Sequence, residues 1–454
     1  MSASCAPLNE PSLHVLYRDV LRNAIAAAAP DELARLELSS TKDGPSLDLP
    51  LYTLGVAGVG KSTLLNTMLS DWMPLLPQGG LGSFTACPIR VVYASEPYLA
   101  IRRTPCDAVA ELVGSLSHPQ PIARALQQAR LLVQGSQFGA APARYLVEVL
   151  RDAMAGRISP STLTQDRGRV SLLVSILTED RRDWMVVRAG THLPELRHEL
   201  EHNAAGFLSP LVTDIELGWA APCLATGVQL VDLPGLGVAH DLQQAQSTRH
   251  LADARACLVV VDRSGLTEVI ASALRPLLMR LIGGPDTEWS HLFVAVTQLD
   301  QIARELRAST PKEARRSWQA YFDDLGTSAR ALLRGQFTQT LATVGLGGED
   351  QRARREGSAR LLRVRHVAPL EHRRRFHNDP TDPPVATDLA GPGITALREH
   401  IADIGTAWTQ RVRGELHQLV RGHAGVRARL GHNLGPVERI LDPALTPGRS
   451  HDPR

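Results

Sequence analysis

Short apolar runs alternate with helical stretches along most of this 454-residue sequence. Apolar residues are continuous within each run, which predicts strands that are buried on both faces. Such strands, separated by helices, are typical of an α/β fold in which helices cover a mostly parallel sheet. The predicted strands are Leu51–Val56, Ile89–Ala94, Val212–Leu217, Val228–Asp232, Cys257–Asp262, Leu292–Thr297 and Leu362–Val367.

Amphipathic helices are predicted on both sides of this alternating region. Apolar residues recur at helical spacing within residues 11–37, and a longer stripe runs from Leu397 to Leu419. Each stripe needs an apolar partner, and each is the obvious partner of the other. We therefore expect an N-terminal bundle helix within residues 1–45, packed against a C-terminal bundle helix that ends in a frayed tail within residues 394–454.

The region between these helices, residues 46–376, is predicted to form one enlarged α/β domain. Residues 96–208 interrupt the alternation with mainly helical sequence, and we interpret them as an insertion. Residues 346–360 are rich in glycine and charge, which predicts a loop. The prolines and glycines of residues 377–393 predict a linker, because they disfavour both helix and sheet.

Composition and charge are ordinary for a globular protein. Hydrophobic residues make up 43% and charged residues 21%, which excludes wholesale disorder, and the net charge of +2 does not demand a nucleic-acid partner. The five cysteines include no C-x-x-C pair, so neither a disulfide framework nor a thiolate zinc site is predicted. Neither a membrane-spanning run nor a signal-peptide core is recognisable, and we expect a cytoplasmic protein.

The strongest candidate for chemistry lies directly after the first predicted strand. Residues 55–62, GVAGVGKS, match G-x-x-x-x-G-K-[ST], and a helix is predicted to follow them. In this motif the glycines let backbone N–H groups approach the phosphates, and the helix N-terminus adds positive charge. Lys61 is expected to neutralise the β- and γ-phosphates, and the Ser62 hydroxyl is expected to bind Mg²⁺.

Two further motifs follow predicted strands. Asp232 and Gly235 fit D-x-x-G, in which the aspartate holds Mg²⁺ through water and the glycine N–H contacts the γ-phosphate. The sequence TQLD at 297–300 approximates [NT]-K-x-D, in which the Asp300 carboxylate would accept hydrogen bonds from guanine N1 and N2. Gln298 stands where lysine is expected, and its shorter side chain predicts weaker stacking on the base.

A switch threonine is expected between the first two motifs. Thr85, within SFTACP before a predicted strand, is the best-placed candidate to reach Mg²⁺, and an ordinary loop threonine is the alternative. The predicted catalytic residues are thus Lys61, Thr85 and Gly235, and the predicted metal-binding residues are Ser62, Thr85 and Asp232. The predicted nucleotide-contacting residues are Gly55, Gly58, Val59, Gly60, Lys61, Ser62, Thr63, Asp232, Thr297, Gln298 and Asp300.

Taken together, these motifs resemble the dynamin superfamily of large GTPases. The resemblance rests on GKSTLLN at 60–66, LLPQGG at 75–80, SFTACP at 83–88 and LVDLPGLG at 230–237, and it is nearest to the germinal-centre nuclear GTPase branch and bacterial dynamin-like proteins. It implies a P-loop GTPase domain, a small bundle of flanking helices, a helical stalk and nucleotide-controlled dimerisation across the active site. The implied function is Mg²⁺-dependent GTP binding and hydrolysis by a homodimer joined through the nucleotide face, with GTP and GDP as ligands.

Departures from that family keep other interpretations open. Ala57-Gly58 stands where dynamins carry Gln-Ser, Gln298 replaces lysine, and the roughly 60 residues after Ile394 are too few for a stalk. Leu236 occupies the place of the water-orienting glutamine of Ras-like enzymes, which predicts slow basal hydrolysis. One alternative is a nucleotide-gated scaffold or assembly module with negligible hydrolysis. Another is an ATP-using P-loop NTPase in which TQLD is accidental.

Two other patterns have competing interpretations. The sequence HELEH at 198–202 matches the zinc-protease motif H-E-x-x-H, but the leucines around it mark an apolar face that leaves both histidines on the solvated side. Residues 351–377 hold nine arginines and two glutamates. They form either a surface for anionic lipid or nucleic acid, or a solvated loop, so membrane and nucleic-acid binding stay open.

Overall fold

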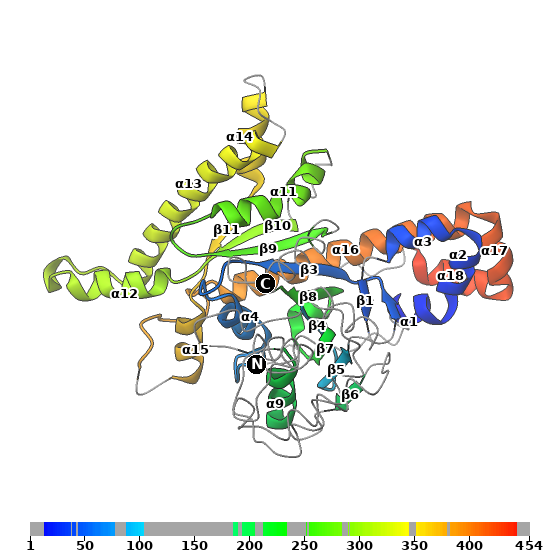
Figure 1. The fold of residues 1–454 in the computed structure, drawn as a ribbon, viewed down its shortest axis with the longest axis horizontal. Coiled ribbons are helices and arrows are strands. Elements are labelled where there is room, and N and C mark those ends of the chain that lie inside the picture. Colours follow the sequence, from blue (N-terminus) through cyan, green and yellow to red (C-terminus); the bar gives the residue numbers. More distant parts are fainter. Residues whose placement is uncertain are drawn as a thin grey trace, which may run out of the picture.

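The computed structural model is a mixed α/β molecule from which a helical arm projects (Figure 1). No described helix is both long enough and apolar enough to cross a membrane. The structure describes residues 13–37, 39–41, 44–77, 88–103, 185–188, 193–204, 212–233, 251, 254–283, 289, 291–344, 351–378 and 382–442.

A nine-stranded sheet forms the centre of the molecule, in the order β11-β10-β9-β3-β8-β4-β7-β5-β6. Neighbouring strands are parallel from β11 through to β8, whereas β4 pairs antiparallel with β8. All the predicted strands are present, so the expected α/β fold with a mostly parallel sheet is confirmed. The strands are β3 (Leu49–Leu54), β4 (Ile89–Tyr93), β5 (Tyr98–Arg103), β6 (Met185–Arg188), β7 (Val212–Trp219), β8 (Val228–Asp232), β9 (Ala256–Val261), β10 (Leu292–Val296) and β11 (Arg363–His366).

Helices cover both faces of this sheet and create two hydrophobic cores. Helices α4 (Lys61–Leu69), α9 (Leu193–Ala204) and α16 (Ile394–Gly422) pack on one face. Helices α11 (Glu268–Gly283), α12 (Leu299–Ser309) and α13 (Trp318–Val344) pack on the other. Strand β9 shows why its apolar run is continuous: Leu258 belongs to the first core, and its neighbours Cys257 and Val259 belong to the second.

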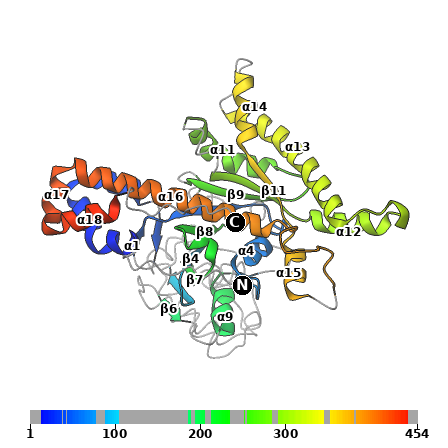
Figure 2. The same ribbon diagram turned by 180° about the vertical axis from the view of Figure 1, so that it is seen from behind.

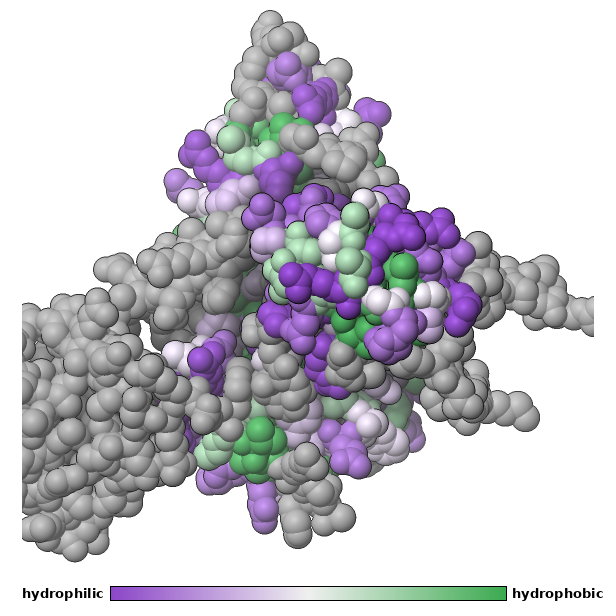
Figure 3. Space-filling model, turned by 90° about the vertical axis from the view of Figure 1, so that its right-hand side faces the viewer, coloured by the Kyte–Doolittle hydropathy of each residue, from purple (hydrophilic) through white to green (hydrophobic). Residues whose placement is uncertain are grey.

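The flanking helices form a small bundle at the far end of α16, away from the sheet (Figures 1 and 2). Seen from that end, hydrophilic side chains mix with smaller apolar patches (Figure 3). Apolar side chains of the N-terminal helices share one core with Val412, Leu416 and Val420 of α16. The expected bundle of flanking helices is therefore present, although the helix at residues 22–28 packs on the helix at residues 424–430, which follows the predicted stripe. The bundle contains α1 (Leu13–Leu16), a π-helical turn (Tyr17–Leu21), α2 (Arg22–Ala28), α3 (Pro30–Leu36), α17 (Ala424–Leu430) and α18 (Leu434–Leu441).

The N-terminal segment is not the single helix that its spacing predicts. Its backbone leaves the helical region at Ala29, with φ −146° and ψ 63°. Pro30 is the cause, because proline restricts the residue before it and starts a new helix readily. In the polar link that follows, β1 (Ser39–Thr41) and β2 (Gly44–Ser46) pair as a small hairpin that the sequence did not predict.

Two other expectations are corrected. The insertion predicted as mainly helical over 96–208 contains strands β5 and β6, because β5 pairs with β7 and buries Leu99 and Ile101. The loop predicted over 346–360 contains α14 (Arg352–Leu361), which buries Ala359 in the second core. Residues 104–184 of the predicted insertion lie outside the described residues.

Candidate nucleotide-binding site

The phosphate-binding motif occupies the turn between β3 and α4. Gly58 and Gly60 have φ of +84° and +85°, a backbone conformation that side-chain-bearing residues rarely adopt. A Cβ at Gly55 would lie 2.7 Å from the carbonyl oxygen of Val260, so this position also requires glycine. Gly60 caps α4 without a side-chain hydrogen bond, which leaves the first N–H groups of the helix directed at the turn.

Lys61 and Asp232 form a buried ion pair at the start of α4, with only 7% and 1% of their side chains exposed. The Lys61 ammonium also donates to the carbonyl oxygen of Leu233. On the neighbouring strand, Thr53 Oγ1 donates to Asp232 Oδ1 at 3.2 Å and to the Val231 carbonyl oxygen at 3.1 Å. The lysine and aspartate of two separate motifs therefore meet, as their predicted roles around one phosphate group require.

The second carboxylate oxygen of Asp232 decides whether Mg²⁺ fits here. Asp232 Oδ2 is buried and has no hydrogen-bond partner among the described residues. Ser62 follows Lys61 in the first turn of α4 and brings a hydroxyl to the same turn. Carboxylate and hydroxyl oxygens are ligands that Mg²⁺ prefers, together with nucleotide phosphates and water. The residues present therefore fit Mg²⁺.

The TQLD segment follows β10 and is attached to the phosphate loop. Thr297 Oγ1 donates to the carbonyl oxygen of Val59, and Gln298 Nε2 donates to the carbonyl oxygen of Gly58 at 2.8 Å. Gln298 reaches this position with a left-handed backbone at φ 63°. The amide that replaces the expected lysine thus connects the base-reading segment to the phosphate loop.

Asp300, at the first turn of α12, has the environment of a base-reading carboxylate. Its side chain is 3% exposed, and Oδ2 is buried without a hydrogen-bond partner among the described residues. Burial raises the pKa of Asp300, although hydrogen bonds from its own N–H and that of Gln301 oppose the shift. A desolvated carboxylate with a vacant oxygen strongly favours a ligand that presents N–H donors, as the Watson–Crick edge of guanine does.

The predicted site residues from Gly55 to Thr63 are continuous through the phosphate loop and the start of α4. Asp232 joins them through Lys61, and residues 297–300 join them through the two hydrogen bonds described above. Thr85 and Gly235, like Leu236, lie outside the described residues, so their predicted roles stay predictions.

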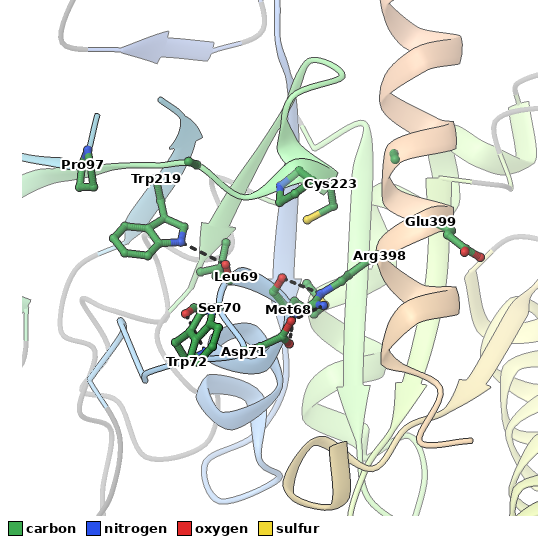
Figure 4. A pocket seen from close by; sticks show the side chains of 13 residues that line it. Met68, Leu69, Ser70, Asp71, Trp72, Pro97, Trp219, Cys223, Arg398 and Glu399 are labelled. Atoms are coloured by element: carbon green, nitrogen blue, oxygen red, sulfur yellow. Dashed lines mark hydrogen bonds and ion pairs between the residues drawn. The ribbon is translucent and has the colours of Figure 1, made fainter. Parts of the chain in front are cut away.

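A second charged cluster joins the end of α4 to α16 (Figure 4). Arg398 donates from Nε to the Met68 carbonyl oxygen at 3.0 Å, and from its Nη atoms to the Thr67 carbonyl oxygen and to Asp71. His372 Nε2 lies 3.0 Å from Asp71 Oδ1. Burial opposes ionisation of Asp71, but hydrogen bonds from His372 and Arg398 outweigh it and hold its pKa well below the usual range.

This cluster lies beside a pocket of about 620 Å³, whose walls come from the end of α4, the β7–β8 connection and α16. Trp219 closes one side and donates from Nε1 to the Leu69 carbonyl oxygen at 3.1 Å, as Figure 4 shows. The sequence did not reveal the cluster, because Asp71 and Arg398 are more than 300 residues apart.

The two competing patterns are partly resolved by the fold. In α9, Leu196 and Leu200 are buried and His198 is exposed, as predicted, whereas the side chain of His202 lies outside the part that the structure describes. No group of three His, Cys, Asp or Glu side chains that could hold a metal ion occurs among the described residues. The arginine-rich segment forms α14, β11 and α15 (Pro369–His377) instead of a loop, and several of its arginines bind other parts of the domain.

Fold and site together define a P-loop nucleotide-binding domain. Residues 52–275 match the Dynamin family, which confirms the resemblance seen in the motifs. A search of curated proteins gave no match.

Solved structures of bacterial dynamins are also similar. Two chains of an oligomerised bacterial dynamin pair, described as providing a mechanism for long-range sensing and tethering of membranes, align with TM-scores of 0.43 and 0.40 at 11% and 12% identity. These alignments cover 92% and 91% of this chain, which spans 48% and 57% of theirs. LeoA, a bacterial dynamin GTPase from ETEC, aligns over 47% of this chain and 30% of its own, with a TM-score of 0.26 and 18% identity.

Proposed function

We propose that this chain binds GTP together with Mg²⁺ and hydrolyses it. The observation that carries the proposal is the convergence of three motifs, in which Lys61 meets Asp232 and the segment that contains Asp300 is tied to the phosphate loop. D-x-x-G and TQLD are weak evidence by themselves, but an acidic strand end and a buried base-reading carboxylate beside a phosphate loop fit one guanine nucleotide.

Each residue then has a defined part. Lys61 and the N–H groups of the loop bind the phosphates, and Asp300 selects guanine. Ser62 and Asp232 would hold Mg²⁺, which supplies charge neutralisation at the phosphate oxygens when it is bound. Thr85 and Gly235 are proposed to close over the γ-phosphate, and positioning by these groups supplies most of the catalysis.

We also propose that the nucleotide controls dimerisation through the face that contains this site. A second candidate function, a nucleotide-gated assembly module with negligible hydrolysis, is favoured by Ala57-Gly58 in the phosphate loop. The two functions differ in turnover but share the same ligand, so one experiment separates them.

The test combines nucleotide titration, phosphate release and light scattering at low and high protein concentration. We expect GTP and GDP to bind in preference to ATP, EDTA to weaken GTP binding, and phosphate release per molecule to rise with protein concentration. Mass that doubles with GTP without phosphate release would favour the assembly module. Equal affinity for ATP and GTP would contradict the guanine assignment.

A matched pair of lysine variants tests the site itself. Lys61→Ala should abolish nucleotide binding, because the ammonium is the buried cation of the phosphate site. Lys312→Ala, at an exposed lysine in a 3₁₀ turn, should leave binding unchanged. Undiminished GTP binding by Lys61→Ala would refute the assignment.

A further inference from the structure

Glu371 is a fully buried carboxylate outside the motifs described above. Its Oε1 accepts hydrogen bonds from the backbone N–H groups of Val385 and Ala386, the latter at 2.7 Å. Its Oε2 accepts two hydrogen bonds from Arg304, from Nε at 3.1 Å and from Nη2 at 2.5 Å. Both oxygens are therefore satisfied, and the side chain joins α15, α12 and the segment that leads into α16.

Arg304 connects this carboxylate to the base-reading residue. It lies four positions after Asp300 in α12, so the two side chains are one turn apart on the same helix. Arg304 Nη1 also binds Asp382 Oδ1 at 3.0 Å, and Arg374 binds the other oxygen of Asp382. Four charged side chains from three segments thus enclose the first turns of the helix that presents Asp300.

Asp300 needs such support because the hydrogen bonds to its carboxylate come from the N–H groups of Asp300 and Gln301, which belong to its own helix. Its Oδ2 has no hydrogen-bond partner among the described residues, so the carboxylate is positioned by the orientation of α12. Recognition of two N–H donors by one carboxylate tolerates errors of only about 0.5 Å. The network also acts electrostatically, since Arg374 favours the ionised form of Asp300 and Glu371 opposes it.

We propose that Glu371 and Arg304 are positioning residues for guanine recognition, which hold α12 so that the Asp300 carboxylate meets the N1 and N2 donors of the base. This inference rests on the proposed function. A purely structural role for the pair would lower stability without changing which base is preferred, and the two roles are therefore distinguishable.

The experiment measures Kd for GTP and for ITP, which lacks the 2-amino group of guanine, by competition against a fluorescent GDP analogue. Glu371→Gln keeps an oxygen for the two backbone N–H groups but presents an NH₂ group to Arg304. Arg304→Lys keeps the charge but cannot make both of the hydrogen bonds that the Arg304 guanidinium donates to Glu371 Oε2. We expect either variant to reduce the preference for GTP over ITP by about tenfold, which corresponds to one misplaced hydrogen bond.

The control is Asp324→Asn, which breaks the exposed ion pair between Arg316 and Asp324 and should leave the preference unchanged. Thermal unfolding is recorded for each variant. If Arg304→Lys lowers the midpoint of thermal unfolding but leaves the ratio of the Kd values for GTP and ITP unchanged, the positioning role is overturned. Because Arg304 is partly exposed, this variant still provides the test if Glu371→Gln does not fold. Equal affinity of the unmodified protein for GTP and ITP would instead refute the contact between Asp300 and the 2-amino group, and equal affinity for GTP and ATP would refute the proposed function.

Discussion

His400 provides the sharpest quantitative test of the structure. This residue of α16 is 3% exposed, and its Nδ1 lies 3.0 Å from the Arg363 guanidinium. Its ring also packs edge-on against Phe293, with 4.9 Å between centroids. Burial lowers the pKa of His400 to about 4, and the charges of Arg363, Arg365 and His291 add to the effect while Asp403 opposes it.

The direction of the pH dependence follows from this depressed pKa. Between pH 6.5 and about 4 the unfolded chain binds a proton at His400 and the folded chain does not. Stability is therefore full above pH 6.5 and falls as the pH is lowered toward 4. With a pKa of about 4 in the folded chain and 6.5 in the unfolded chain, the free energy of unfolding should be lower at pH 5.0 than at pH 7.5 by about 2 kcal/mol.

The assay is urea unfolding at pH 7.5 and pH 5.0, followed by tryptophan fluorescence and circular dichroism. His400→Asn keeps an acceptor for Arg363 but cannot take up a proton, so its pH-dependent loss should be smaller than that of the unmodified protein by about 2 kcal/mol. His432→Asn, at an exposed histidine, is the matched control and should behave like the unmodified protein. Equal losses in the unmodified protein and His400→Asn would refute the argument.

Two further predictions concern the end of α4. Arg398→Ala removes the hydrogen bonds to Thr67, Met68 and Asp71 and should lower the free energy of unfolding, measured in urea, by about 3 kcal/mol. The control is Arg421→Ala, at an exposed position of the same helix, which should lower it by less than about 0.5 kcal/mol. Asn66→Ala leaves the buried N–H groups of Leu75 and Leu76 and the carbonyl oxygen of Leu76 without the partner that Asn66 provides. The free energy of unfolding should fall by about 3 kcal/mol, and a decrease below about 1 kcal/mol would show that water replaces those contacts.

Strands buried on both faces were predictable because such strands have apolar residues at successive positions of the sequence. Strand β9 is the clearest case, since every residue from Ala256 to Val261 is buried. Strand β5 was missed because it ends in Arg102 and Arg103, and its pairing with β7 depends on residues more than 100 positions away. Helix α14 was missed because its sequence is mostly polar, and its packing against the second core depends on residues far away in the sequence.

In the site, too, local motifs were predictable from the sequence and contacts between distant residues were not. The phosphate loop, Asp232 and the TQLD segment are local motifs whose chemistry depends on a few adjacent residues, so the sequence alone could suggest them. Thr53 binds Asp232, Arg398 binds Asp71 and Glu371 binds Arg304, and each of these pairs is separated by 67 or more positions, so only the fold brings the partners together. The hydrogen bond from Gln298 to Gly58 was predictable only in part: the motif identified Gln298 as a site residue, but not the contact that its amide makes with the phosphate loop.

The contacts along α16 determine how the nucleotide site relates to the bundle. Helix α4 starts at the phosphate loop and spans nine residues, about 13 Å, before its last carbonyl groups meet Arg398. Farther along α16, Trp408 Nε1 donates to the Leu47 carbonyl oxygen and Thr409 Oγ1 to that of Thr226, both at 2.8 Å. Because α16 is held at both levels, rotation of this part of the helix against the domain would break the hydrogen bonds of Arg398, Trp408 and Thr409. Helix α4 therefore connects the phosphate loop directly to the base of α16.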